Sequence, residues 1–128
     1  MQLHHINIKG PQELLEREKE FFCEVLGLRE GDRPGFSSRG YWLYADGKAI
    51  VHLSESDSHF SNENQGFFDH VAFQTSNLVE FIQVLKDRKI DHSIVYLAEI
   101  EMTQVFFKAP SGTGIEINFQ DERIEATP

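Results

Sequence analysis

The sequence predicts an α+β fold built from two successive βαβββ modules. The length of 128 residues suits one compact domain, and 40% hydrophobic with 26% charged residues is the composition of an ordinary globular protein. The order of strand-like and helix-like segments in the first half recurs in the second. We therefore expect a single domain over residues 1–120, with module one at 1–54, a linker at 55–66, module two at 67–120 and a C-terminal tail at 121–128.

The first module begins with a short strand and a helix. Residues 2–8 alternate in character and end at a Lys-Gly-Pro sequence, which predicts a strand. Apolar residues recur at helical spacing over residues 12–26, and Gly27 stands where a helix commonly ends. The Asp46-Gly47 pair between two apolar runs predicts a β-hairpin. Two or three antiparallel strands are thus expected after the helix.

The second module repeats this order. Residues 67–75 form a strand-like run, and Asn77 with Glu80 three positions later resembles a capping box at the start of a helix. Leucine, phenylalanine and isoleucine then recur at helical offsets through Leu85. Three further strand-like runs cover residues 90–100, 101–109 and 114–119, with a turn sequence before the last.

Charge and composition exclude several classes of partner. The 12 basic against 21 acidic residues give a formal charge of −9, which disfavours nucleic acid and anionic membranes because both require a basic face. No apolar run approaches the roughly 20 residues of a membrane span, and the first ten residues lack the layout of a secretory signal. We expect a cytoplasmic protein. Its one cysteine, Cys23, is expected to pack in an apolar environment.

The internal repeat brings out four metal-capable residues. Aligning LHHINI with FDHVAF places His5 on His70 at an offset of 65, and aligning IVHL with GIEI places His52 on Glu116 at an offset of 64. Each half therefore contributes one such residue from its first strand and one from its last. We expect all four in the middle of a strand, where side chains are held rigidly on one face.

The motifs LHHINI, EFFCEVLGL, YWLYADGKAIVHL, FDHVAF and VFFKAPSGTGIEINF resemble those of the vicinal oxygen chelate superfamily in order and spacing. That superfamily includes glyoxalases, bleomycin resistance proteins and extradiol dioxygenases. The resemblance covers nearly the whole chain and implies two modules forming a cupped mixed sheet. It also implies one divalent metal ion held by a residue from each of strands one, four, five and eight. In this sequence those residues are His5, His52, His70 and Glu116.

Each expected ligand also has an ordinary structural interpretation. A histidine within a strand is more often hydrogen-bonded than metal-bound, and the repeat reverses that preference for His5 and His70. A buried Glu116 between two isoleucines is costly unless it is paired, protonated or bound to a cation. Ligation by His52 stays open, because the superfamily sometimes leaves that position out of the coordination sphere. Three imidazoles and one carboxylate suit Zn²⁺, Ni²⁺, Fe²⁺, Co²⁺ or Mn²⁺.

The resemblance implies a small metalloenzyme of the glyoxalase/dioxygenase type. Four protein ligands of an octahedral ion leave two positions for adjacent oxygen atoms of a small substrate, and Glu116 and His52 are also the expected catalytic residues. Lyase, isomerase, transferase and dioxygenase chemistry stay open, although a histidine at position 52 disfavours an isomerase. The −9 charge offers no obvious funnel for an anionic fosfomycin-type substrate. The alternative is a non-catalytic small-molecule binding or resistance protein on the same fold.

Two expectations concern the pocket and the assembly. The polar residues Asn7, Gln74 and Asn118 share a strand face with an expected ligand and should contact the substrate. Aromatic residues of the third and seventh strands should form the walls, from among Tyr41, Trp42, Tyr44, Phe106 and Phe107. Which strand face points inward stays open, and the three that we select are Trp42, Tyr44 and Phe107. Because the superfamily builds the site either within one chain or between exchanged modules of two chains, we expect a homodimer.

Overall fold

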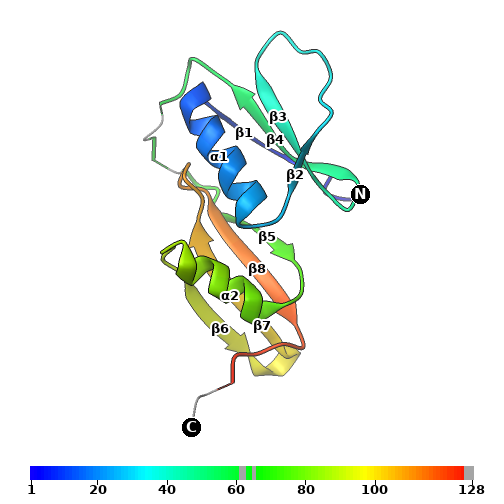
Figure 1. Cartoon of the computed structure of the whole chain (residues 1–128), viewed down its shortest axis with the longest axis vertical. Helices are drawn as coiled ribbons and strands as arrows, with labels where there is room; N and C mark the ends of the chain where they lie inside the picture. The colour runs from blue at the N-terminus through cyan, green and yellow to red at the C-terminus, as the bar shows by residue number, and fades with distance from the viewer. Residues whose placement is uncertain (61–62, 65, 126–128) are drawn as a thin grey trace. The chain divides into compact units, whose positions relative to one another are not determined.

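The computed structural model describes residues 1–60, 63–64 and 66–125 and divides the chain into two units, Met1–Asn64 and Gln65–Pro128. Each unit has the order βαβββ, so the predicted α+β fold of two modules is confirmed (Figure 1). The elements of unit one are β1 (Ile6–Gly10), α1 (Gln12–Glu24), β2 (Arg29–Gly31), β3 (Gly40–Ala45) and β4 (Lys48–Glu55). Those of unit two are β5 (His70–Gln74), α2 (Leu78–Asp87), β6 (Ser93–Leu97), the 3₁₀ turn η1 (Ala98–Ile100), β7 (Met102–Lys108) and β8 (Gly114–Gln120).

Unit one is a four-stranded mixed sheet with one helix. The strand order is β1-β4-β3-β2, with β1 parallel to β4 and the other pairs antiparallel. Leu15 and Phe22 of α1 are fully buried, as are Leu43 and Leu53 of the sheet. Burial of these apolar side chains supplies the main force that holds the helix on one face and leaves the other face for polar residues.

The Asp46-Gly47 hairpin forms as predicted. Both residues have positive φ, 51° at Asp46 and 77° at Gly47, and they alone separate β3 from β4. Two positive φ values are the signature of the two-residue turn whose twist matches that of the flanking strands. The turn sets the pairing of Tyr44 with Ala49, and a register shift between Leu43 and Tyr44 then places Trp42 opposite His52.

Unit two repeats the arrangement with strand order β5-β8-β7-β6, β5 and β8 being parallel. The ring of Phe81 on α2 lies 5.7 Å from that of Phe107 and 5.5 Å from that of Phe119, between ring centroids. Phe107 and Phe119 alternate with Phe106 and Asn118 along their strands, so the helix covers one face only.

The start of α2 differs from the predicted capping box. Asn77 has a left-handed backbone with φ 71° and makes no side-chain cap. The carboxylate of Glu122 instead accepts hydrogen bonds from the backbone amides of Asn77 at 3.0 Å and Leu78 at 2.9 Å. The cap therefore comes from a residue after the last strand, and sequence rules for helix caps consider only residues next to the helix.

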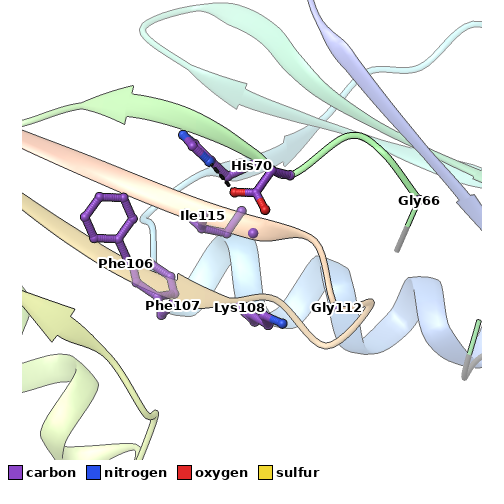
Figure 2. A pocket seen from close by; sticks show the side chains of 9 residues that line it. Gly66, His70, Phe106, Phe107, Lys108, Gly112 and Ile115 are labelled. Carbon is purple, nitrogen blue, oxygen red and sulfur yellow. Dashed lines mark hydrogen bonds and ion pairs between the residues drawn. The ribbon is translucent and has the colours of Figure 1, made fainter. Parts of the chain in front are cut away.

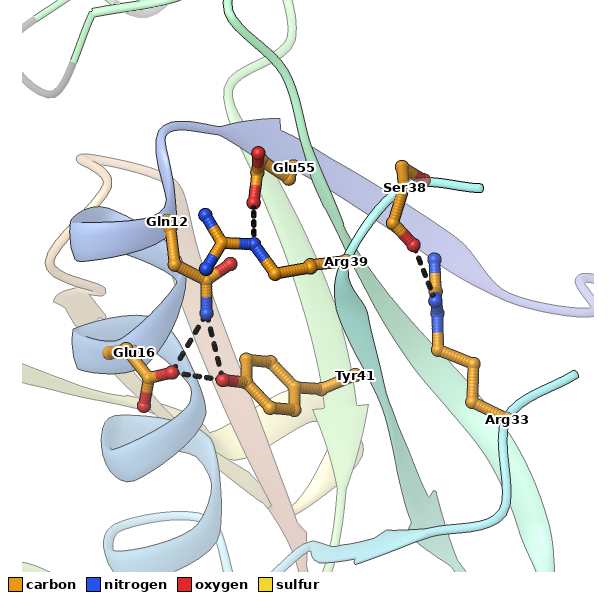
Figure 3. A network of polar contacts seen from close by, with 7 residues as sticks. All are labelled: Gln12, Glu16, Arg33, Ser38, Arg39, Tyr41 and Glu55. Atoms are coloured by element: carbon orange, nitrogen blue, oxygen red, sulfur yellow. Dashed lines mark hydrogen bonds and ion pairs between the residues drawn. The ribbon is translucent and has the colours of Figure 1, made fainter. Parts of the chain in front are cut away.

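A polar cluster joins α1 to β3 on the helix-covered side of unit one (Figure 3). The hydroxyl of Tyr41 donates to the carboxylate of Glu16, and the amide of Gln12 donates to Glu16 at 2.8 Å and to Tyr41 at 2.9 Å. The hydrogen bond from Tyr41 is the main reason that the pKa of Glu16 lies below its usual range. These contacts tie the helix to the sheet through side chains.

Cys23 is half-buried, and burial raises the pKa of its thiol, which agrees with the packing role expected from the sequence. Within the described ranges, neither helix has the length and apolar character that a bilayer crossing requires.

Candidate functional site

His70 and Glu116 form a pair on one face of the second sheet. His70 opens β5, Glu116 lies in the middle of β8, and Nε2 of His70 is 3.2 Å from Oε1 of Glu116. Nδ1 of His70 lies 2.7 Å from the carboxylate of Asp69. The hydrogen bond to Asp69, followed by the charge of Glu116, raises the pKa of His70. Asp69 thus holds the proton on Nδ1 and directs Nε2 toward Glu116.

Glu116 is 8% exposed and is oriented by a neighbour on β7. The amide of Gln104 donates to Oε2 of Glu116 at 3.2 Å, which leaves Oε1 facing His70. The buried carboxylate is therefore paired through both oxygens, as the cost of burying a charge requires.

His5 and His52 form the corresponding pair in the first unit. Their rings are stacked, with centroids 3.8 Å apart and planes 12° apart. The indole of Trp42 stacks on the other face of His52 at 4.1 Å, also at 12°. His52 is 7% exposed, and burial, followed by the nearby His5, lowers its pKa. The His52 imidazole is therefore held neutral between two rings.

One nitrogen of each of these two rings has a partner. Nε2 of His52 lies 3.1 Å from the carbonyl oxygen of Ala49, so Nε2 carries the proton and Nδ1 offers a lone pair. Nδ1 of His5 lies 2.9 Å from Nδ1 of His4, which leaves Nε2 of His5. In the second unit the corresponding atoms are Nε2 of His70 and Oε1 of Glu116. Imidazole nitrogens and carboxylate oxygens are ligands that suit divalent transition metals.

The four expected ligands lie as one pair in each unit. In the part of the chain that the structure describes, no three His, Cys, Asp or Glu side chains form a group that could hold a metal ion. The expectation that all four lie in mid-strand is wrong for two of them. His5 precedes β1 and His70 is the first residue of β5, because pairing with β4 begins at Ile6 and pairing with β8 begins at Gly114.

The three polar residues expected to contact the substrate share faces with these pairs. Asn7 lies directly opposite His52, and its Oδ1 accepts a hydrogen bond from Ser54 at 3.2 Å. Gln74 lies opposite Asn118, two residues along each strand from Ala72 and Glu116. Oδ1 of Asn118 is buried without a hydrogen-bond partner among the described residues, so it is an acceptor still to be satisfied. Substrate contact by these residues stays a prediction.

The aromatic residues divide between the two faces of their sheets. Trp42 stacks on His52, whereas the Tyr44 hydroxyl donates to the backbone oxygen of Asp32 at 2.6 Å. Phe107 packs under α2, although it also borders a pocket. Phe106 lies opposite Glu116, and its ring is 6.2 Å from that of His70. Of the two aromatic rings on β7, Phe106 is therefore the one on the same face as His70 and Glu116. The strand register decides which ring takes this face, and the sequence leaves that register open.

A pocket of about 420 Å³ lies beside His70 (Figure 2). Its lining includes Asp69, His70, Phe106, Lys108 and Gly114. Lys108 is a lining residue that sequence reasoning missed. The available signal was parity: Lys108 follows Phe106 by two positions on β7 and so shares its face.

The fold matches several solved structures. An integron cassette protein from the mobile metagenome of the Halifax Harbour sewage outfall has TM-score 0.69 and 22% identity, covering 92% of this chain and 97% of that one. A glyoxalase/dioxygenase from Nostoc punctiforme has TM-score 0.75 and 18% identity, covering 94% and 92%. FosX, a fosfomycin resistance protein from Listeria monocytogenes, has TM-score 0.71 and 15% identity, covering 93% of each chain.

FosX has also been crystallised in complex with Mn(II) and a sulfate ion. No protein-family model matches the sequence, and no curated protein matches it. The solved structures and the two βαβββ units lead to the same conclusion. The chain has the fold of the vicinal oxygen chelate superfamily, as its sequence motifs predicted.

Proposed function

We propose that this protein is a divalent-metal-dependent enzyme that acts on a small substrate with adjacent oxygen atoms. The observation that carries the proposal is the pair formed by His70 and Glu116, 3.2 Å apart, with its counterpart formed by His5 and His52 in the other unit. The Mn(II) complexes of FosX support the choice of a divalent metal. The metal would be held by all four residues, with His52 the least essential.

The hydrogen bonds that these residues make through their other polar atoms fit this role. Asp69 accepts from Nδ1 of His70, and the Ala49 carbonyl accepts from Nε2 of His52. Metal-bound histidines commonly donate their other ring N–H to such an oxygen, which fixes the tautomer. Gln104 orients Glu116 by donating a hydrogen bond to Oε2, which leaves Oε1 for the metal. Binding requires His5 to leave its stack on His52, because both rings must present a lone pair in their own planes.

A bound metal supplies Lewis-acid polarisation of the substrate oxygens. The protein groups then position the substrate and move its protons. Glu116 is the expected base, since its carboxylate faces His70 and is shielded from water. His52, whose pKa is lowered by burial, is neutral at physiological pH and is the second candidate to accept a proton.

The proposal is tested by the intrinsic fluorescence of Trp42, the only tryptophan. Because Trp42 stacks on His52, Mn²⁺, Co²⁺ or Ni²⁺ bound by His52 and His5 should quench its emission in a saturable way. We expect His5→Ala, His70→Ala and Glu116→Ala each to weaken metal affinity by roughly tenfold or more, and His52→Ala to weaken it less. His59→Ala is the matched control, since the His59 ring pairs with Glu63 in the linker and is not one of the proposed ligands.

Measuring the metal content of protein purified without chelator tests the proposal independently of the fluorescence titration. The proposal is overturned if well-folded protein neither retains nor binds a divalent metal, or if Glu116→Ala binds metal as tightly as the parent. That result would favour the alternative, a small-molecule binding or resistance protein without catalytic metal. A metal-loaded protein that turns over no substrate with adjacent oxygens would favour it as well.

A further inference from the structure

Lys108 and His70 flank a position without a side chain. Lys108 at the end of β7 is paired with Gly114 of β8, and Gly114 is paired in turn with His70 of β5. Residues paired across neighbouring strands project from the same face of a sheet. Gly114 has no side chain, and the Asp69 carbonyl oxygen and Cβ of His70 lie close over it. Lys108, Gly114 and His70 all line the pocket of about 420 Å³ (Figure 2).

Lys108 lies where this pocket meets a second one. The second pocket, of about 480 Å³, includes His92 and Ser93 in its lining and shares Phe106, Phe107 and Lys108 with the first. Lys108 therefore borders both cavities, and Phe106, two residues before it on β7, is paired with Glu116 of β8.

The charge of Lys108 is uncompensated. Its side chain is exposed and, among the residues that the structure describes, forms no ion pair or hydrogen bond. The carboxylate in the pocket lining, Asp69, is already bound to His70 at 2.7 Å. In a chain of net charge −9, an anion binds only where a local cation outweighs the overall repulsion. Lysine supplies that cation as a compact donor to oxyanions.

We propose that Lys108 binds an anionic oxygen group of the substrate, a carboxylate or a phosphate-type group. This assignment rests on the proposed function, because it places the adjacent oxygens of the same substrate at His70 and Glu116. Two strand spacings, about 10 Å, separate the backbones of Lys108 and His70, and the lysine side chain spans part of that distance. The substrate class is therefore a small oxyacid whose anion is joined to its adjacent oxygens through a short spacer lying over Phe106.

The test uses inorganic phosphate and acetate as probes on ¹⁵N-labelled full-length protein without metal. Backbone amide resonances of Lys108, Gly112 and Gly114 should shift in a saturable way with phosphate or acetate, relative to chloride at equal ionic strength. Lys108→Met should weaken the tighter anion by about tenfold, the loss expected for one charge-assisted hydrogen bond. Lys108→Arg should retain binding. Lys48→Met, at an exposed position of β4, controls for net charge.

The two probes distinguish the two forms of the anionic group, since the one that binds more tightly identifies carboxylate or phosphate as the preferred group. The proposal is overturned if neither anion gives a saturable shift at these residues, or if Lys108→Met binds as the parent does. Because no metal is present, failure here is separable from failure of the metal proposal, which Trp42 fluorescence reports. Anion binding without metal binding would leave Lys108 as the anion site and reject the metal.

Discussion

At the scale of single residues, the candidate site depends on the hydrogen-bond partners that orient each side chain as well as on the side chains themselves. The repeat in the sequence brought out His5, His52, His70 and Glu116 because their spacing is visible in one dimension. It did not reveal that the Ala49 carbonyl and Gln104 orient two of them. The backbone path places the Ala49 carbonyl beside His52, and strand register places Gln104 beside Glu116. Neither can be determined from a single sequence.

The Tyr41 hydroxyl should control the ionisation of Glu16. Since Glu16 has a lowered pKa in the folded protein, its carboxylate stabilises the fold above the unfolded pKa, and that contribution is lost as the pH falls through the lowered folded pKa. We expect Tyr41→Phe to raise the pKa of Glu16 toward its ordinary value, as followed by carboxyl-carbon NMR. The stability difference between parent and variant should shrink in acid.

Tyr44→Phe is the control for Tyr41→Phe, because the Tyr44 hydroxyl donates to a backbone oxygen of Asp32 and not to a carboxylate. An unchanged Glu16 titration in Tyr41→Phe would show that the hydrogen bond does not set this pKa.

Gly114 should tolerate no side chain. A Cβ there would lie 2.4 Å from the Asp69 carbonyl oxygen and 2.9 Å from Cβ of His70, so β5 and β8 would have to separate. We expect Gly114→Ala to lower the free energy of unfolding by about 1–3 kcal/mol in chemical denaturation. Gly66→Ala is the matched control, since nothing lies within 4 Å of its added Cβ. Equal stability of the two variants would contradict the tight approach.

At the scale of elements, the sequence predicted the parts whose signals are local. Helical periodicity predicted α1 and α2, and the Asp46-Gly47 pair predicted the β3–β4 hairpin, because these signals act within a few residues. The ends of β1 and β5 were missed, since the extent of a strand depends on its partner. The capping box at Asn77 was also wrong, because the cap comes from Glu122, 45 residues away.

Glu122 should therefore anchor α2. Its carboxylate accepts two backbone amides at the helix N-terminus and complements the helix dipole there. We expect Glu122→Gln to lower the free energy of unfolding by about 0.5–2 kcal/mol, because the amide has one acceptor oxygen and no charge. Glu125→Gln, at an exposed position with the same charge change, should have little effect. Urea denaturation of both variants measures the difference, and identical midpoints would contradict the cap.

At the scale of the whole molecule, the repeat accounts for both the fold and the candidate site. The two units have the same order of elements and corresponding strand pairings, so His5 with His52 and His70 with Glu116 occupy corresponding places. The resemblance predicted one four-ligand site, and each unit carries two of the four expected ligands.

We predict a homodimer in which the modules are exchanged, so that His5 and His52 of one chain share an ion with His70 and Glu116 of the other. The linker at 55–66 is rich in polar residues, and its length permits this exchange. The test mixes His5→Ala and Glu116→Ala proteins, which each lack one ligand, and refolds them together. In an exchanged dimer, each mixed pair has one intact site and one doubly broken site, so metal quenching of Trp42 partly returns.

If each site forms within one chain, every site in the refolded mixture still lacks a ligand and quenching does not return. Each variant refolded alone is the control for recovery caused by refolding itself. Light scattering decides the assembly independently, because a monomer at micromolar concentration would reject the dimer. In that case the four ligands, if they bind one ion, must meet within a single chain, and the parent's metal affinity should then be independent of protein concentration.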